Sequence, residues 1–336
     1  MTSGGPELDV SILIVSYNTR EMTLATIASV FEQARTANFE VIVVDNASSD
    51  GSAEAIGERF PEVKLVASAE NLGFGGGNNL AGESARGRRI LLLNPDTVVL
   101  DHAIDRICDF ADGHPDLGVW GGRTVFADGS LNPASCWGKP TLWSLFCMAS
   151  GLRSLEDSPV FNPEGYGGWR RDSTREVDIV AGCFLLIDAD LWRRLGGFDR
   201  AFFMYAEEAD LCLRARRLGA RPTITPDATI IHHGHASEPR QTDQRVKLFA
   251  GRITLTKRHD GLVGGWLGTR LYIAAVMIRV FGLGLLGRLT GAKRMRDSAA
   301  AWKDVWERRA LWIDGWNEEG IAWARTASRP GAANGR

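Results

Sequence analysis

Polar residues that could do chemistry on a charged ligand follow two strongly apolar runs of the chain. Asp45 and Asn46 come directly after a run of valines, and Asp96 follows residues 90–93 and Pro95. An aspartate directly after a buried strand can accept a hydrogen bond from a base N–H or a ribose hydroxyl, which makes Asp45 a candidate for nucleotide recognition. Asp96 is a candidate ligand for a hard divalent cation, since Mg²⁺ or Mn²⁺ takes one or two carboxylates together with phosphate oxygens.

A second group of such residues lies further along the chain. Glu207 and Glu208 open a predicted helix, where the helix dipole favours acidic side chains. The dipole does not account for the paired histidines, His232 and His233, that end a predicted strand about two dozen residues later. In a chain that already offers Asp96, two histidines at a strand end are candidate metal ligands.

The residues after the first apolar run exclude one common class of nucleotide-binding protein. A dinucleotide-binding fold places G-x-G-x-x-G there, so that the backbone can approach a pyrophosphate. This chain has Ser16, Tyr17 and Asn18 at that point, which argues against a nicotinamide-dependent dehydrogenase. A sugar nucleotidyltransferase also needs a glycine-rich phosphate loop there, and it is kept only as a minor alternative.

The order of the predicted elements is that of a parallel α/β sheet. Residues 10–16, 41–44 and 90–93 are predicted strands buried on both faces. Residues 21–33 and 52–60 are predicted helices between them. The β-α-β-α order predicts a right-handed, mostly parallel, Rossmann-like sheet flanked by helices, with ligands at the carboxyl ends of its strands.

Regular patterns return after an irregular stretch. Residues 119–175 are rich in Gly, Pro, Trp and Ser, and they predict loops and short irregular strands that shape a pocket. Residues 177–187 are regular again, and residues 189–195 and 206–218 predict helices that end at glycines. Residues 223–231 predict the strand that leads into the histidines.

The composition changes near residue 248, so we predict a catalytic domain at 1–247 and a helical extension at 248–336, with disorder over residues 324–336. The apolar stretch 271–286 contains Arg279 and is shorter than the ~20 residues that a spanning helix needs, so no transmembrane helix is predicted. Tryptophans and arginines among aliphatic residues favour a helix in the membrane interface, and therefore a peripheral membrane protein. Packing of these helices on the catalytic domain, or on the partner in a homodimer, is an equally weighted alternative.

Composition adds exclusions rather than a function. The 336 residues carry 39 basic and 41 acidic side chains, a net charge of −2, which gives no reason to expect nucleic acid as a partner. Five cysteines without a C-x-x-C pair favour buried thiols in a reducing cytosol. Residues 1–9 have no signal-peptide pattern, so the expected location is cytoplasmic, at the inner face of the cell membrane.

Together these segments resemble the family 2 inverting glycosyltransferases, which have a GT-A fold, and among them the rhamnosyltransferase-like branch. The order and spacing of the motifs carry the resemblance, which covers about residues 8–240. The matching stretches are Ser11 to Asn18, Val44 to Gly51, Asn71 to Phe74, Asn94 to Asp96, Gly196 to Asp199, Phe202 to Arg214, and His232.

The resemblance implies a donor site and a metal site. In it, Asp45 recognises the base, and Asn71 with Phe74 forms the donor-pocket loop. Asp96 is the last residue of the family's D-x-D metal motif, and His232 helps to hold a divalent cation, Mg²⁺ or Mn²⁺, with His233 as the neighbouring alternative. The implied donor-binding residues are Ser16, Tyr17, Asn18, Asp45, Asn46, Asn71, Phe74 and Asn94.

The resemblance also implies a catalytic base and a reaction. Glu208 occupies the base position, where Asp is commoner in the family, and Glu207 is the alternative. The implied reaction transfers a sugar, from dTDP-rhamnose above other nucleotide sugars, to a hydroxyl of a cell-surface glycan or lipid-linked precursor. Because Asn94 and Glu208 depart from the commoner residues, a catalytically inactive scaffold that binds glycans or nucleotide sugars is the main alternative.

Overall fold

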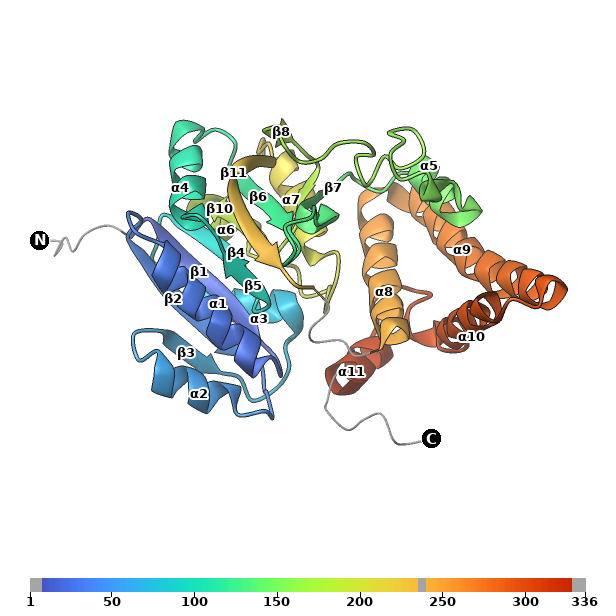
Figure 1. The fold of residues 1–336 in the computed structure, drawn as a ribbon, viewed down its shortest axis with the longest axis horizontal. Helices are drawn as coiled ribbons and strands as arrows, with labels where there is room; N and C mark the ends of the chain where they lie inside the picture. The colour runs from blue at the N-terminus through green and yellow to red at the C-terminus, as the bar shows by residue number, and fades with distance from the viewer. Residues whose placement is uncertain (1–7, 235–239, 328–336) are drawn as a thin grey trace, which may run out of the picture. The chain divides into compact units, whose positions relative to one another are not determined.

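The computed structural model describes residues 8–234 and 240–327, which form two compact units (Figure 1). The α/β unit comprises residues 8–137, 169–200 and 207–234, and the helical unit comprises residues 138–168, 201–206 and 240–327. The predicted boundary between residues 247 and 248 differs from this division. It falls inside a helix, and two segments predicted for the catalytic domain belong to the helical unit.

A large mixed sheet forms the centre of the α/β unit. Its described strands run in the order β3-β2-β1-β4-β10-β6-β11-β5, with β8 also paired to β11, and β7 pairs separately with β9. The strands are β1 (Val10–Ser16), β2 (Phe39–Asp45), β3 (Lys64–Ala67), β4 (Arg89–Leu93), β5 (Thr97–Val99), β6 (Val119–Val125), β7 (Cys136–Trp137), β8 (Arg175–Glu176), β9 (Ile179–Val180), β10 (Phe184–Asp188) and β11 (Thr223–His232). Strands β3, β2, β1 and β4 are mutually parallel, as predicted, whereas β10 is antiparallel to both of its neighbours.

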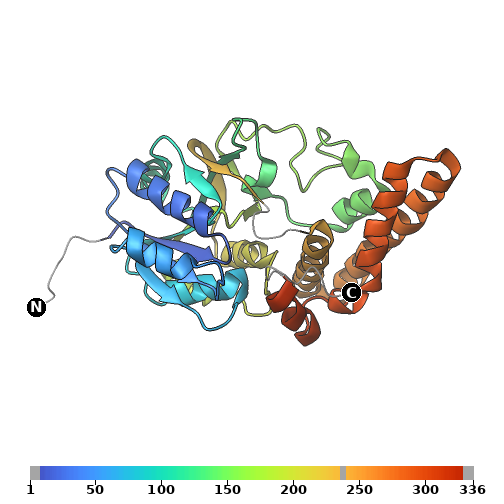
Figure 2. The same ribbon diagram turned by 60° about the horizontal axis from the view of Figure 1, so that its bottom comes forward.

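Helices lie on both faces of this sheet (Figures 1 and 2). One face carries Ile12, Ile14 and Leu91, which are fully buried with residues of α1 and α4. Helix α3 packs on β1 and β2, and α6 packs on β10 and α7. The helices of this unit are α1 (Arg20–Gln33), α2 (Ser52–Arg59), α3 (Gly73–Gly82), α4 (Ala103–Gly113), α6 (Ala189–Leu195) and α7 (Glu207–Arg217), with the 3-10 turn Pro133–Ser135. The predicted α/β class is confirmed.

Helix α3 is an element that the sequence did not predict, because it is rich in glycine. Its glycines serve close packing: a Cβ at Gly77 would lie 2.7 Å from Val15 Cγ1, and one at Gly75 would lie 3.1 Å from Phe198 Cβ. The absence of side chains lets α3 approach β1 directly. Tertiary packing therefore outweighs the low helix propensity of glycine in this segment.

Strand β6 corrects the prediction of irregular structure after residue 119. It lies between β10 and β11 and is almost entirely buried. Gly121 and Gly122 obscured the strand pattern. A Cβ at Gly121 would overlap Val180, and one at Gly122 would overlap the Ala228 carbonyl, so the close approach of neighbouring chain segments requires glycine here.

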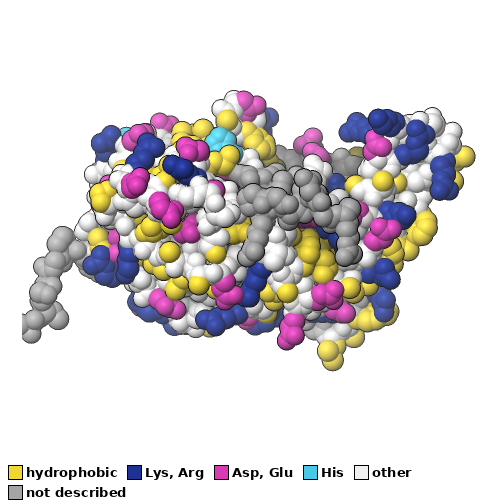
Figure 3. Space-filling model, turned by 90° about the horizontal axis from the view of Figure 1, so that it is seen from below, with side chains coloured by type: hydrophobic (Ala, Val, Ile, Leu, Met, Phe, Trp, Pro, Cys, Tyr) yellow, Lys and Arg dark blue, Asp and Glu magenta, His cyan; other side chains and the backbone are white. Residues whose placement is uncertain are grey.

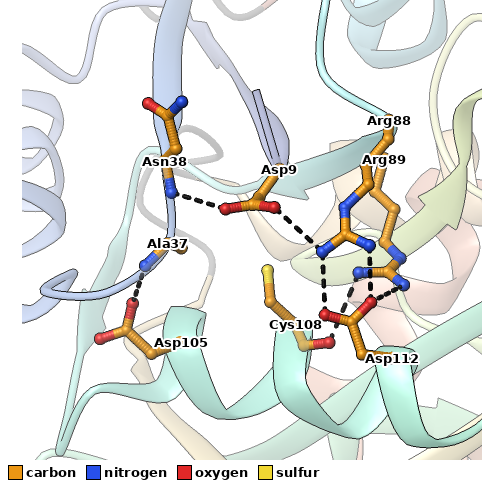
Figure 4. A network of polar contacts seen from close by, with 8 residues as sticks. All are labelled: Asp9, Ala37, Asn38, Arg88, Arg89, Asp105, Cys108 and Asp112. Atoms are coloured by element: carbon orange, nitrogen blue, oxygen red, sulfur yellow. Dashed lines mark hydrogen bonds and ion pairs between the residues drawn. The ribbon is translucent and has the colours of Figure 1, made fainter. Parts of the chain in front are cut away.

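A network of charged residues joins the amino ends of the strands (Figure 4). The Arg88 guanidinium contacts Asp9 at 2.9 Å and Asp112 at 2.7 Å, and Arg89 Nη2 contacts Asp112 at 2.6 Å. Asp105 accepts hydrogen bonds from the backbone N–H groups of residues 35–37. These pairs lie at the edge of the sheet opposite the carboxyl ends of β1, β2 and β4, where the predicted ligand site is.

The helical unit has its own core of aromatic residues, including Phe249, Tyr272 and Trp312. Its helices are α5 (Leu142–Ser150), α8 (Gln241–His259), α9 (Gly261–Thr290), α10 (Lys293–Glu307) and α11 (Glu318–Ala327), with 3-10 turns at Leu152–Ser154 and Arg309–Leu311. One expectation changes: residues 324–327 are helical rather than disordered. The rest of the predicted disordered segment, residues 328–336, lies outside the described residues.

Helix α9 is longer than the apolar stretch predicted at residues 271–286. Its 30 residues make it long and apolar enough to cross a membrane. Its glycines do not interrupt it, and the helix continues to a left-handed turn at Gly291, whose φ is +71°.

Candidate active site

The structure brings Asp96 and His232, 136 positions apart in the chain, into contact. Strands β5 and β11 pair antiparallel with His232 opposite Thr97, and the backbone N–H of His233 donates to the Asp96 carbonyl at 3.0 Å. His232 Nε2 lies 3.4 Å from Asp96 Oδ1, and both side chains are largely buried. The side chain of His233 is exposed, as expected for the residue next to an inward-facing one in extended chain.

Asn94 is the third polar residue of this cluster. Its Nδ2 lies 3.4 Å from His232 Nε2, and its backbone N–H donates to the Cys183 carbonyl at 3.2 Å. Asn94 Oδ1 is buried and has no hydrogen-bond partner. A buried acceptor without a partner is costly unless a ligand satisfies it.

The surroundings of the His232 imidazole favour a positive charge. Burial lowers its pKa, but the Cys183 thiol and the Asp96 carboxylate raise it, and the net result is a pKa above the ordinary value. A bound cation would take the place of the proton on the ring, since a metal-ligating imidazole must be neutral.

These residues fit a divalent cation that shares its coordination with a phosphate ligand. The donor set is one carboxylate, one imidazole and one amide oxygen, from Asp96, His232 and Asn94. Over residues 8–234 and 240–327, no three His, Cys, Asp or Glu side chains form a metal-binding group. A Mg²⁺ or Mn²⁺ ion would therefore complete its coordination with phosphate oxygens and water, as these ions commonly do in proteins.

Asp45, at the end of β2, has the geometry expected of a base-recognising residue. Only 4% of its surface is exposed. Oδ2 accepts a hydrogen bond from the Ser48 N–H at 3.2 Å, whereas Oδ1 is buried without a partner. One carboxylate oxygen thus fixes the side chain to its own turn, and the other remains available to an N–H or O–H donor.

The loop after β1 is tied to the loop after β2. Asn18 has a left-handed backbone with φ +52°, and its Oδ1 accepts from the Ser49 N–H at 2.8 Å. The Asn18 Nδ2 group is buried without a partner. Ser16 points elsewhere, because its Oγ lies 2.9 Å from Thr23 Oγ1 inside the fold, and Tyr17 is half-buried.

Asn46 and Asn71 hold the start of α3. Asn46 Nδ2 donates to Asn71 Oδ1 at 3.0 Å, and Asn46 Oδ1 accepts from the Leu72 N–H at 2.9 Å. Asn71 Oδ1 also accepts from the Gly73 N–H at 2.9 Å. Both amides are therefore engaged with the loop that carries Phe74, which gives them a positioning role.

Gly182 lies between two parts of the site: the cluster of Asp96, His232 and Asn94, and the start of α7 with Glu207 and Glu208. A Cβ at this position would lie 3.0 Å from the Phe74 ring and 3.7 Å from Glu208 Cβ. Phe74 and Glu208 therefore both lie against Gly182, and the carbonyl of the next residue, Cys183, accepts a hydrogen bond from Asn94. The sequence analysis missed Gly182, which carries no motif signal.

Thr26 was missed for the same reason. Its Oγ1 donates to the carbonyl groups of Pro95 and Thr97, at 2.9 and 2.7 Å. This hydroxyl on α1 holds the turn that carries Asp96. A single threonine in an amphipathic helix gives no signal of such a role.

The acidic pair at the start of α7 consists of two different carboxyl groups. Glu207 is only 3% exposed, and its Oε2 has no hydrogen-bond partner. Burial and the neighbouring Glu208 raise the pKa of Glu207 well above the ordinary value. Glu208 is half-buried. The raised pKa favours the neutral acid at Glu207, so Glu208 is the better candidate base of the two.

The backbone just before the pair is unusual. Tyr205 and Ala206 both have positive φ, +67° and +71°. Residues without a glycine's freedom adopt this conformation at a cost, and such positions are frequent at functional sites. Further along α7, Asp210 Oδ2 accepts from Arg214 Nε at 2.6 Å, and Arg214 also donates to the carbonyls of Leu195 and Gly197, so this pair is structural.

Comparison with known proteins identifies the family. The model of the family described as "Glycosyl transferase family 2" matches residues 11–178. The N-acetylglucosaminyl-diphospho-decaprenol L-rhamnosyltransferase of Mycobacterium tuberculosis is 30% identical over 239 residues, which cover 66% of this chain and 76% of that protein. The O-antigen biosynthesis protein RfbC of Myxococcus xanthus is 27% identical over 231 residues, 68% of this chain and 17% of that protein.

Solved structures share the fold at low sequence identity. The mannosyltransferase PcManGT from Pyrobaculum calidifontis, in complex with GDP-Man and Mn²⁺, has a TM-score of 0.56 at 18% identity and covers 91% of this chain and 88% of its own. GalNAc-T7, solved with UDP, GalNAc and Mn²⁺, has a TM-score of 0.53 at 13% identity and covers 76% and 48%. The fold is the GT-A fold of these glycosyltransferases. The chain belongs to glycosyl transferase family 2, as the sequence motifs predicted.

Proposed function

We propose that this glycosyltransferase transfers L-rhamnose from dTDP-rhamnose, with inversion, to a hydroxyl of a lipid-linked or cell-surface glycan precursor. The observation that carries the proposal is the contact between Asp96 and His232 at the sheet edge that also bears Asp45. The choice of sugar and acceptor class draws on the rhamnosyltransferase of M. tuberculosis, which is named for a lipid-linked acceptor.

The donor would be held at its two ends by different residues. The buried Oδ1 of Asp45 can accept the N–H of the pyrimidine base. Asp96, His232 and the Asn94 amide would hold a Mg²⁺ or Mn²⁺ ion, whose chemistry when bound is to neutralise the charge that develops on a departing diphosphate. Phe74 follows the loop that Asn46 and Asn71 hold, and its ring lies against Gly182.

Glu208 would act as the general base. A sugar hydroxyl is a poor nucleophile, so a positioned carboxylate must take its proton as the oxygen attacks the anomeric carbon. The attack occurs opposite the bond to the diphosphate, so the anomeric centre inverts and a single base is sufficient. Burial and the neighbouring Glu208 raise the pKa of Glu207, which disfavours a second negative charge next to the base.

The proposal is tested with purified protein and a panel of dTDP-rhamnose, UDP-GlcNAc and GDP-mannose, each with Mn²⁺. We expect dTDP-rhamnose to raise the melting temperature most, because a bound donor stabilises the folded state by mass action. We also expect dTDP release that stops when EDTA removes the cation. Asp96→Asn should lose both effects, whereas Asp101→Asn, an exposed position at φ +41° that asparagine tolerates, should keep them.

Other results would change the assignment in defined ways. A larger effect from another donor would replace rhamnose as the transferred sugar. Donor binding without release of nucleoside diphosphate, with lipid-linked and soluble glycan acceptors present, would favour the inactive scaffold. Turnover that is unaffected by EDTA and by Asp96→Asn would exclude the cation at this site.

A further inference from the structure

Helix α9 has one face that no described part of the helical unit covers. It packs on α5, α8 and α10 through residues such as Gly268, Tyr272 and Val276, which are buried. At 100° per residue the large exposed side chains fall on the opposite half of the helix. They are Leu262, Val263, Trp266, Leu267, Ile278, Phe281, Leu285 and Leu289, with exposed fractions from 38% to 94%, whereas Leu286, 47% exposed, lies on the same side as Gly268.

This apolar face is too long to be incidental. At 1.5 Å per residue the 30 residues of α9 extend about 45 Å. Only 17% of its most apolar window is buried in the protein, whereas the core helix of a water-soluble domain is mostly buried. A contiguous apolar surface of this size marks contact with a membrane or another protein.

The charged residues around this face favour a membrane over another protein as the partner. Helix α9 contains three arginines and no acidic residue. Arg279 turns inward, where its guanidinium donates to the Ala275 and Met148 carbonyls. Arg270, the tenth residue of the helix, and Arg288, near its C-terminal end, are exposed.

Further basic residues gather where α9 ends. Lys293, Arg294 and Arg296 follow Arg288 before the first acidic residue, Asp297, and all are exposed. Figure 3 shows Lys and Arg side chains clustered at the end of the helical unit where α9 meets α10. At the other end, Trp266 and Arg270 line a hollow together with Lys257, and the Arg270 guanidinium lies 5.4 Å from the Trp266 ring centre. Tryptophan and basic residues beside apolar ones are typical of helices at the level of lipid headgroups.

We propose that the exposed face of α9 inserts into the surface of a bilayer that contains anionic lipids, with the helix axis parallel to the membrane plane. The helix would lie on the membrane rather than cross it, since α5, α8 and α10 pack along its other face and would have to enter the hydrocarbon with it. Arg270, Arg288 and the basic residues that follow would contact anionic headgroups, and the exposed apolar side chains on both sides of Arg270 would contact the upper part of the acyl chains. This inference does not depend on the proposed donor or acceptor.

Flotation of the full-length protein with vesicles tests the proposal. We expect binding to vesicles of phosphatidylcholine with 30% phosphatidylglycerol, about tenfold weaker binding to phosphatidylcholine alone, and weakening by salt. Phe281→Glu with Leu285→Glu should reduce binding at least about tenfold, because two apolar side chains leave the membrane. The control is Phe126→Glu with Leu218→Glu, two apolar positions in the α/β unit that are 42% and 46% exposed, which should bind as the wild type does.

Melting temperature and donor-dependent release of nucleoside diphosphate confirm that each variant is folded and active in solution. Four results would overturn the proposal. The wild type could fail to float with either vesicle. The α9 variant could bind as well as the control. The protein could form a dimer that Phe281→Glu with Leu285→Glu dissociates, with no vesicle binding by either form, which would assign the face to a second copy of the chain. Resistance of bound protein to extraction by alkaline carbonate would instead show that α9 spans the bilayer.

Discussion

At the scale of single residues, Glu207 and Glu208 show how burial separates two adjacent carboxyl groups. Glu207 is enclosed and its pKa is raised, whereas Glu208 is half-buried against Gly182. Adjacent positions on a helix point about 100° apart, so neighbours in sequence can have quite different surroundings. The two residues therefore respond differently to the same isosteric substitution.

Glu208→Gln should lower kcat by about 10²- to 10⁴-fold, the usual contribution of a general base. The melting-temperature shift caused by the donor should remain, because the substitution removes the base and leaves the donor contacts in place. Steady-state kinetics and thermal shift on the same preparation check this. Near-normal turnover by Glu208→Gln would move the base elsewhere, to Glu207 first.

Glu207→Gln should change the free energy of unfolding and leave the catalytic base, Glu208, in place. Because the folded pKa of Glu207 is raised above its unfolded value, its protonated form stabilises the fold fully at acidic pH, and this contribution is lost as pH rises through the folded pKa. Glutamine has no proton to lose, so the variant should gain stability relative to the wild type between pH 5 and pH 8.5. Urea unfolding across that range measures the difference, with the exposed Glu54→Gln as control. A constant difference at all pH values would mean that Glu207 is ionised in the folded protein.

The sequence predicted part of this site for a physical reason. Asp45 and Asp96 follow the apolar runs of parallel strands, whose carboxyl ends meet at one edge of the sheet. His232 was identified by its place at a strand end. The roles of Thr26 and Gly182 depend on which carbonyl or ring lies opposite, and only the tertiary structure fixes that.

At the scale of elements, α3 shows a helix made possible by what its residues lack. Gly77 faces Val15, and the distance between the helix and β1 leaves no room for a methyl group. Patterns of apolar residues cannot reveal such an element, because its packing face consists of glycines. The strands at residues 10–16 and 90–93 were predictable, because continuous apolar runs indicate burial on both faces of a sheet.

Gly77→Ala should destabilise the fold by about 1–3 kcal/mol, the usual cost of overpacking a tight contact. Gly113→Ala is the matched control, because Gly113 also lies in a helix and a Cβ there has no neighbour within 4 Å. It should be neutral or stabilise by up to about 1 kcal/mol. Urea unfolding of the two variants at the same pH gives the comparison. Equal stability of Gly77→Ala and the wild type would show that α3 can move away from β1 without cost.

At the scale of the whole molecule, the chain passes between its two units several times. Local composition predicted one change near residue 248, but residues 138–168 and 201–206 also pack in the helical unit. Composition reports local preference, whereas membership of a unit depends on contacts between distant segments. The apolar stretch 271–286 covers only part of α9 for a similar reason, since glycines that weaken an isolated helix are tolerated where they allow close packing on α8 and α10.

The segment 201–206 has a consequence for the order in which the protein is made. Trp316 Nε1 donates to the Met204 carbonyl at 3.1 Å, and Gly251 lies directly against the Tyr205 carbonyl, one residue before the chain reaches Ala206 and then Glu207. During synthesis the ribosome releases the strands and the acidic turn well before residues 251 and 316. The backbone that leads into Glu207 therefore acquires these contacts only after residue 316 has emerged, so a nascent chain that already contains every proposed donor-binding residue still lacks the contacts that hold the backbone before Glu207.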